Sequence, residues 1–221
     1  MRGFDVKQIR MRSFQISGLT AKWGIGGGRK PSIWDNNLVG RWDARTFPDG
    51  DLATIPNTAT MEGKAPDLIA NGPTMADGTL QFDGVDDKAY AAAFVFPERF
   101  TVFWDIDWLG TVDAGAGIIH GTNLIMYNRK ATESLLTYIR NAPGAIPNTR
   151  VGVSTNGKVY AKDGSITPFG GIVGTGTGNA PLFIANRGTA FTQMGFRQLL
   201  IFNKELSQDE VNDVLSVMFP A

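Results

Sequence analysis

From about residue 38 to residue 219 the sequence predicts an all-β fold, in which two antiparallel sheets pack as a jelly-roll sandwich that ends in one short C-terminal helix. Three observations predict this fold. Short apolar segments such as "TLQFDG" and "FTVFWDIDWLG" recur without helical periods between them. Turn residues separate the segments, in a chain with 27 glycines and 11 prolines. Asn156-Gly157, flanked by alternating apolar residues, is a strong hairpin signal.

The first 37 residues differ from the rest and predict an extended, basic N-terminal arm with a glycine-rich linker. Apolar residues between Phe4 and Ile16 fall in pairs of period two, which is typical of extended backbone. "WGIGGGRKPS" then predicts the linker. The segment has two acidic residues, Asp5 and Asp35, and a larger basic set: Arg2, Lys7, Arg10, Arg12, Lys22, Arg29 and Lys30. We expect residues 1–30 to dock on a partner; the alternative is that they add a strand to their own domain.

Residues 38–221 are long enough for one large domain with a full core. Basic and acidic residues balance at 21 each, so we expect neither nucleic acid nor a membrane surface as a partner.

The longest apolar run, "YAAAFVF", is far below the roughly 20 residues that a membrane helix needs. Charges interrupt every apolar run of the N-terminus, which predicts no secretion signal. The chain has no cysteine, which excludes disulfides and thiolate chemistry.

One helix is predicted at about residues 208–217. Ser207 at the N-cap and Glu210 three residues later form a capping box. Leu206 and Val211 are placed for a hydrophobic staple, and the apolar residues that follow recur at helical spacing. We expect this helix to pack on the edge of the sandwich.

The segments "LVGRWDA", "LQFDGVDDKAY", "FTVFWDIDW", "PLFIANRG" and "FRQLLIFNKELSQDEVNDVL" follow one another in this order along the chain. Together they resemble the laminin-G-like, concanavalin-A-like jelly rolls, and the match covers roughly residues 38–219. "RWDA" and "FDGVDD" are similar to the versions carried by phages and prophages of gut Bacteroidetes. The resemblance implies two antiparallel sheets and a role in binding or assembly. It does not imply an activity, because this fold hosts lectins, glucanases and structural modules.

Asp83, Asp86 and Asp87 lie close together in "LQFDGVDDKAY" and allow three interpretations. A calcium site is one, since laminin-G relatives often bind calcium with ligands from several loops; "DGVDD" alone is too short to supply the six to eight separated oxygens. A pair of catalytic acids is the second. The third, which we favour, is a β-hairpin in which these carboxylates accept backbone hydrogen bonds at the turn. We therefore predict no metal and no cofactor.

The resemblance also permits a test for catalysis. Glucanases of this fold carry E-x-D-x-x-E on one strand, with the nucleophile and the acid roughly 5 to 5.5 Å apart in a retaining mechanism. In "DIDWLG", Asp105 falls at the nucleophile position, Asp107 at the helper position and Gly110 at the position of the acid. Without a general acid this mechanism fails, so we predict that the protein is not an enzyme.

Other candidates are weaker. His120 lacks a surrounding triad motif, and "GIVGTGTGN" lacks the lysine and the helix of a phosphate-binding loop, so both are interpreted as structural. Trp104 alternates with residues of the predicted core. Trp108, Tyr127 and Asn123 are the candidate contacts for a ligand such as a sugar ring.

These observations favour a phage virion component, either a head or tail decoration or a fibre. Residues 1–30 would anchor it to other virion proteins, and the jelly roll would face outward and bind a host surface glycan. Such a protein is made in the host cytoplasm and leaves with the particle. A homo-oligomer, with a trimer favoured, is expected. The alternatives are a lectin-like carbohydrate-binding module that acts alone and, with less support, a glycoside hydrolase.

Overall fold

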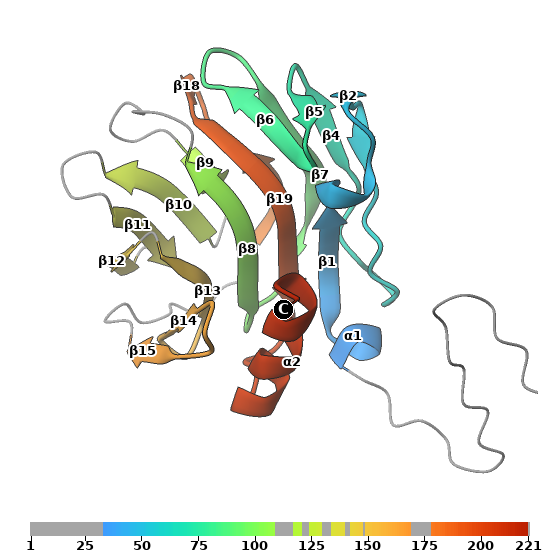
Figure 1. Cartoon of the computed structure of the whole chain (residues 1–221). Coiled ribbons are helices and arrows are strands. Elements are labelled where there is room, and N and C mark those ends of the chain that lie inside the picture. Colours follow the sequence, from blue (N-terminus) through green and yellow to red (C-terminus); the bar gives the residue numbers. More distant parts are fainter. Residues whose placement is uncertain are drawn as a thin grey trace, which may run out of the picture. The chain divides into compact units, whose positions relative to one another are not determined.

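The structure, a computed structural model, describes residues 33–108, 117–120, 124–129, 134–139, 142–147, 149–168 and 178–220 (Figure 1). The chain divides into Met1–Lys30 and Pro31–Ala221. Residues 1–32 of the predicted arm lie outside the described residues. Its last residues are described and begin with the short helix α1 (Ile33–Asn36), where the prediction was extended backbone. Within the described residues, neither helix combines the length and the apolar character needed to cross a membrane.

Two antiparallel sheets form the domain (Figure 1). The nine-stranded sheet contains, in spatial order, β15 (Ile166–Pro168), β14 (Lys158–Ala161), β13 (Arg150–Ser154), β8 (Thr101–Trp108), β19 (Gln193–Phe202), β6 (Thr79–Asp83), β5 (Thr74–Ala76) and β2 (Gly50–Asp51), with β1 (Leu38–Asp43) also paired to β19. The eight-stranded sheet contains β12 (Ala142–Pro147), β11 (Ser134–Ile139), β10 (Leu124–Arg129), β9 (Gly117–His120), β16 (Gly178–Ile184), β7 (Lys88–Phe96), β4 (Leu68–Asn71) and β3 (Thr54–Ile55).

Shorter elements complete the described part: the helix α1 (Ile33–Asn36), the 3-10 turn η2 (Ala44–Thr46), the ribbon of β17 (Asn186–Arg187) with β18 (Ala190–Phe191), and the C-terminal helix α2 (Gln208–Met218). The predicted all-β, two-sheet fold with a C-terminal helix is confirmed. The predicted Asn156-Gly157 hairpin is confirmed as well, because β13 and β14 pair across it, with Ser154 opposite Lys158.

The strand β19 organises the nine-stranded sheet. It pairs with β8 from Met194 to Phe202 on one side; on the other side its first half pairs with β6 and its second half with β1. Its C-terminal half is almost continuously apolar, because both faces are buried there. Leu199 and Ile201 pack in the core between the sheets, while Leu200 and Phe202 pack against α2.

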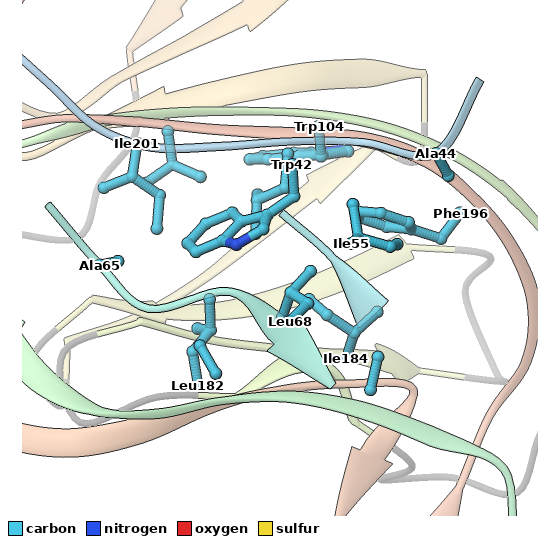
Figure 2. Close-up of a cluster of buried hydrophobic side chains, with 14 of the residues drawn as sticks. Trp42, Ala44, Ile55, Ala65, Leu68, Trp104, Leu182, Ile184, Phe196 and Ile201 are labelled. Carbon is cyan, nitrogen blue, oxygen red and sulfur yellow. The ribbon is translucent and has the colours of Figure 1, made fainter. Parts of the chain in front are cut away.

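The core between the sheets combines side chains from both (Figure 2). Trp42 and Trp104 are almost completely buried, as the alternation predicted for Trp104. Each indole N–H donates to a backbone carbonyl, of Pro66 and of Arg150, at 3.1 Å. Both indoles therefore bury a large apolar surface without leaving a polar atom unpaired.

The helix α2 begins with the predicted capping box. The Ser207 side chain accepts from the Glu210 N–H, and the Glu210 carboxylate accepts from the Ser207 N–H at 2.9 Å. Its predicted position on the edge of the sandwich is wrong. The helix covers the outer face of the nine-stranded sheet, where Phe103, Leu200 and Phe202 would otherwise be exposed apolar surface.

The predicted hairpin at residues 80–90 is also wrong, although both strands and the turn are present. β6 pairs with β5 and β19 in the nine-stranded sheet, whereas β7 pairs with β4 and β16 in the eight-stranded sheet. Residues 84–87 therefore carry the chain from one sheet to the other.

Candidate functional site

The three carboxylates of this sheet-crossing turn come together, with one oxygen of each of Asp83, Asp86 and Asp87 within 4.8 Å of the others. Two of the carboxylates hold the turn. Asp83 Oδ1 accepts from the Val85 N–H at 2.7 Å, and Asp87 Oδ2 accepts from the Asp83 N–H at 2.9 Å. Burial raises the pKa of Asp87, and the neighbouring carboxylates of Asp83 and Asp86 add to this effect. The hydrogen bonds give Asp83 and Asp87 the structural role that a turn requires.

A second polar cluster lies on the outer face of the nine-stranded sheet, beside the end of α2. The strand register places Asp43 opposite Gln198 and Gln198 opposite Asp105. A β-bulge between Phe196 and Gln198 inserts one extra residue into β19. As a result both Arg197 and Gln198 reach carboxylates on this face.

Arg197 binds both carboxylates that the glucanase pattern singled out. Its guanidinium donates to Asp105 Oδ1 at 2.7 Å, to Asp107 Oδ1 at 2.8 Å and to Asp107 Oδ2. These hydrogen bonds raise the pKa of Arg197 and lower the pKa of Asp107. Both groups are therefore held charged, and one cation is shared by the two carboxylates.

Asp43 and Arg45 extend this cluster toward the helix. Arg45 donates from Nε and Nη2 to the two Asp43 oxygens, at 2.9 and 2.8 Å, and from Nη1 to the Met218 carbonyl at 2.8 Å. Gln198 Nε2 donates to Asp43 Oδ2 at 2.9 Å. A cation at the C-terminal end of α2 is favourable because the last carbonyls carry partial negative charge. The cluster thus fixes the helix on the sheet.

The remaining predicted site residues are not brought together by the described strands. Trp108 ends β8, where its backbone lies opposite Met194 in the nine-stranded sheet. Tyr127 lies in β10 of the eight-stranded sheet, opposite Leu136. His120 ends β9, opposite Phe183 and Ile125. Asn123, Gly110 and most of "GIVGTGTGN" lie outside the described residues.

Sequence reasoning missed Arg197, Arg45 and Gln198. The available signal was the polar pair Arg197-Gln198 inside the apolar run of β19, because adjacent polar residues in a buried strand are a sign of a bulge. The carboxylate partners of Arg197 are 92 and 90 residues away along the chain, so local patterns do not identify them.

No protein-family model and no curated protein sequence matches the chain. Solved structures do. The Trypanosoma rangeli sialidase in complex with sialic acid matches with a TM-score of 0.56 and 12% identity, over 82% of this chain and 33% of the sialidase. The botulinum neurotoxin serotype D binding domain matches with a TM-score of 0.62 and 14% identity, over 84% of this chain and 53% of that chain. This chain therefore spans about a third of one structure and half of the other, and the likeness is one of fold.

Proposed function

We propose that this protein is a non-enzymatic binding module and a phage virion component, either a head or tail decoration or a fibre. Residues 1–30 attach it to other virion proteins, and the β-sandwich binds a glycan of the host surface. In this proposal the copies form a homo-oligomer, with a trimer favoured.

The main support for a non-enzymatic protein is the pairing of Arg197 with Asp105 and Asp107. A glycosidase nucleophile must be available to the anomeric carbon, on the opposite face of the sugar from the leaving group that its partner acid protonates. Here both carboxylates accept hydrogen bonds from one guanidinium, on a sheet face that α2 partly covers. Such an arrangement supports a structural ion pair rather than a nucleophile.

The fold is compatible with a binding function, but the same fold also occurs in an enzyme. The solved structures with this fold include a sialidase in complex with sialic acid and a neurotoxin binding domain. A β-sandwich of this type is therefore present both in an enzyme and in a binding domain. The virion role rests on the resemblance of "RWDA" and "FDGVDD" to phage-borne jelly rolls and on the basic character of residues 1–30.

A polysaccharide screen tests this function. The purified chain is incubated with bacterial capsular and plant polysaccharides, and both retention on the immobilised polymer and release of reducing ends are measured. We expect retention on at least one polymer with no sustained release of reducing ends. Sustained release that survives in Asp105→Asn would indicate a hydrolase with catalytic groups elsewhere. Sustained release that disappears in this variant would show that the Arg197 pair is catalytic. Either result contradicts the proposal.

A further inference from the structure

A small hollow lies between α2 and the turn that joins β14 to β15. Its volume is about 220 Å³, and it is lined by Lys162, Asp163, Gly164, Asn212, Leu215, Ser216 and Phe219. Drug-sized ligands occupy pockets of roughly 300–1,000 Å³. The hollow is thus below that range, and its size suits one six-membered ring rather than a nucleotide or an oligosaccharide.

Three hydrogen bonds hold the turn that forms one wall of the hollow. The Gly164 N–H donates to the Ala161 carbonyl at 3.0 Å, the Ala161 N–H donates to the Ser165 carbonyl at 2.9 Å, and the Ser165 N–H donates to Asp163 Oδ1 at 2.9 Å. Gly164 has a φ of +83°, which favours glycine. A Cβ at Gly164 would lie 3.1 Å from Asn212 Oδ1, so a side chain there would press on the helix wall.

The helix side is tied to the same turn. Gln208 Nε2 donates to the Gly164 carbonyl at 3.4 Å and to Asn212 Oδ1 at 2.9 Å. Because its oxygen accepts from Gln208, Asn212 offers its amide N–H groups as donors. Both walls therefore hold their polar groups in place before a ligand arrives, which lowers the entropic cost of binding.

The lining offers the groups that recognise hydroxyls. Asp163 supplies an exposed carboxylate acceptor, Asn212 and Lys162 supply donors, and the Ser216 hydroxyl, which donates to the Asp213 carbonyl at 2.7 Å, supplies an acceptor. Leu215 and Phe219 supply apolar surface. Lys162 Nζ lies 4.6 Å from the centroid of the Phe219 ring, so a cation–π contact holds its ammonium over that ring.

The charges favour a neutral ligand. One ammonium and one carboxylate line the hollow, so their charges cancel, and the Arg197 cluster near Lys162 is itself occupied by ion pairs. An ionised ring of either sign would be attracted by one of these groups and repelled by the other, so the pair gives a charged ligand no net advantage. Paired donors and acceptors around a small apolar patch match the alternating hydroxyls and C–H groups of a sugar.

From this geometry we infer that the hollow between α2 and residues 162–164 is a binding site for a single neutral sugar ring, such as the terminal unit of a glycan. The inference rests on the proposed function, which it makes more specific by giving the glycan a place on the molecule. Asp163 and Asn212 orient the hydroxyls, and Leu215 and Phe219 contact the apolar side of the ring.

The test uses the full chain and the methyl α-glycosides of glucose, mannose, galactose and N-acetylglucosamine, with methyl glucuronoside as the charged comparison. Binding is followed by NMR shifts of the backbone amides. We expect at least one neutral glycoside to shift the resonances of residues 162–165 and 212–219.

Two pairs of variants locate the site. Ser216→Trp, which fills the hollow, should abolish the shifts, while Val217→Trp, at the next exposed position, should leave them unchanged. Asp163→Asn should weaken binding about tenfold, against no change for Asp213→Asn, because a hydrogen bond to a charged group is lost.

Thermal unfolding of each variant confirms that the protein is folded. Equal glycoside binding by the Ser216→Trp and Val217→Trp variants would overturn the site while leaving the proposed glycan-binding function intact. If no neutral glycoside shifts these resonances, the site is overturned as well. The polysaccharide screen then decides the function separately, since retention on a polymer does not require this hollow. Stronger binding of the glucuronoside would overturn the assignment of a neutral ligand.

Discussion

Arg197 shows how one side chain determines the chemistry of a sheet face. Its side chain is about a quarter exposed, that of Asp105 is almost buried, and that of Asp107 is half-exposed. The charge of Asp105 is acceptable in this position because it is paired and hydrogen-bonded. Removing the cation would leave a nearly buried carboxylate without its partner, which costs more than the loss of an exposed ion pair.

We therefore expect Arg197→Met to lower the free energy of unfolding by about 2 kcal/mol at neutral pH, the scale of a lost hydrogen bond to a charged group in a partly buried position. Asp107→Asn should cost less than about 1 kcal/mol, because the Asp107 side chain is half-exposed and its pair is screened. Urea denaturation measures both. An equal loss of unfolding free energy in the two variants would show that Arg197 does not stabilise the nearly buried Asp105 carboxylate.

The same pair predicts a dependence on pH. Since Arg197 lowers the pKa of Asp107, the folded state binds this proton less tightly than the unfolded chain does. The resulting stability is present above the unfolded pKa of about 3.9 and is lost as the pH falls through the lower, folded value. The unfolding free energy of Arg197→Met should accordingly fall less steeply below about pH 4 than that of the wild type. If the unfolding free energies of the variant and the wild type fell in parallel with pH, the lowered pKa of Asp107 would not be caused by Arg197.

Among the elements, the sheet-crossing turn and α2 show what local sequence patterns can predict and what they cannot. The sequence predicted β6, β7 and the turn, because the apolar alternation and the aspartates that accept backbone hydrogen bonds in a turn are local signals. It did not predict that the strands join different sheets, since the same pattern fits a hairpin. The capping box predicted α2 closely, but its position depends on the apolar outer face of β8 and β19, which only strand pairing brings together. For the same reason Asp105 was found as a candidate residue and its partner Arg197 was not.

The position of Asp87 leads to a prediction at Gly72, which lies between β4 and β5 and faces the Asp87 side chain. This residue has a φ of +97°, and a Cβ there would lie 2.0 Å from Asp87 Oδ1. Gly72→Ala should cost about 3 kcal/mol, the sum of about 1–2 kcal/mol for left-handed backbone and the displacement of a buried hydrogen-bonded carboxylate. Gly63→Ala is the matched control: its φ is +72° and nothing lies within 4 Å of the added Cβ. Chemical denaturation should show a clearly larger loss for Gly72→Ala; equal losses would mean that Asp87 moves without cost.

At the scale of the whole molecule, the question is whether residues 1–30 belong to the fold or serve only for attachment. The described core is built between Leu38 and Met218, from the two sheets and α2. Charge distinguishes the parts, because residues 1–37 contain seven basic and two acidic residues in a chain that is neutral overall. A basic segment suits an acidic partner surface, and the proposed attachment would use strand addition, in which backbone bonds provide affinity and alternate side chains fill pockets.

Deletion of residues 1–30 tests this division of roles. The truncated protein should unfold with a free energy within about 1 kcal/mol of that of the full chain, because the buried apolar side chains that stabilise the described sheets are all retained. It should also keep its polysaccharide binding, since the sheets and α2 are unchanged. Incorporation into particles, measured by mass spectrometry of purified virions after complementation, should be lost. A control chain has the seven basic residues of this segment replaced by Gln, which removes the charge and keeps the backbone. Reduced but measurable incorporation of this control is expected if strand addition contributes to attachment. If the truncated protein fails to fold, or still enters particles at the level of the full chain, residues 1–30 are not the anchor.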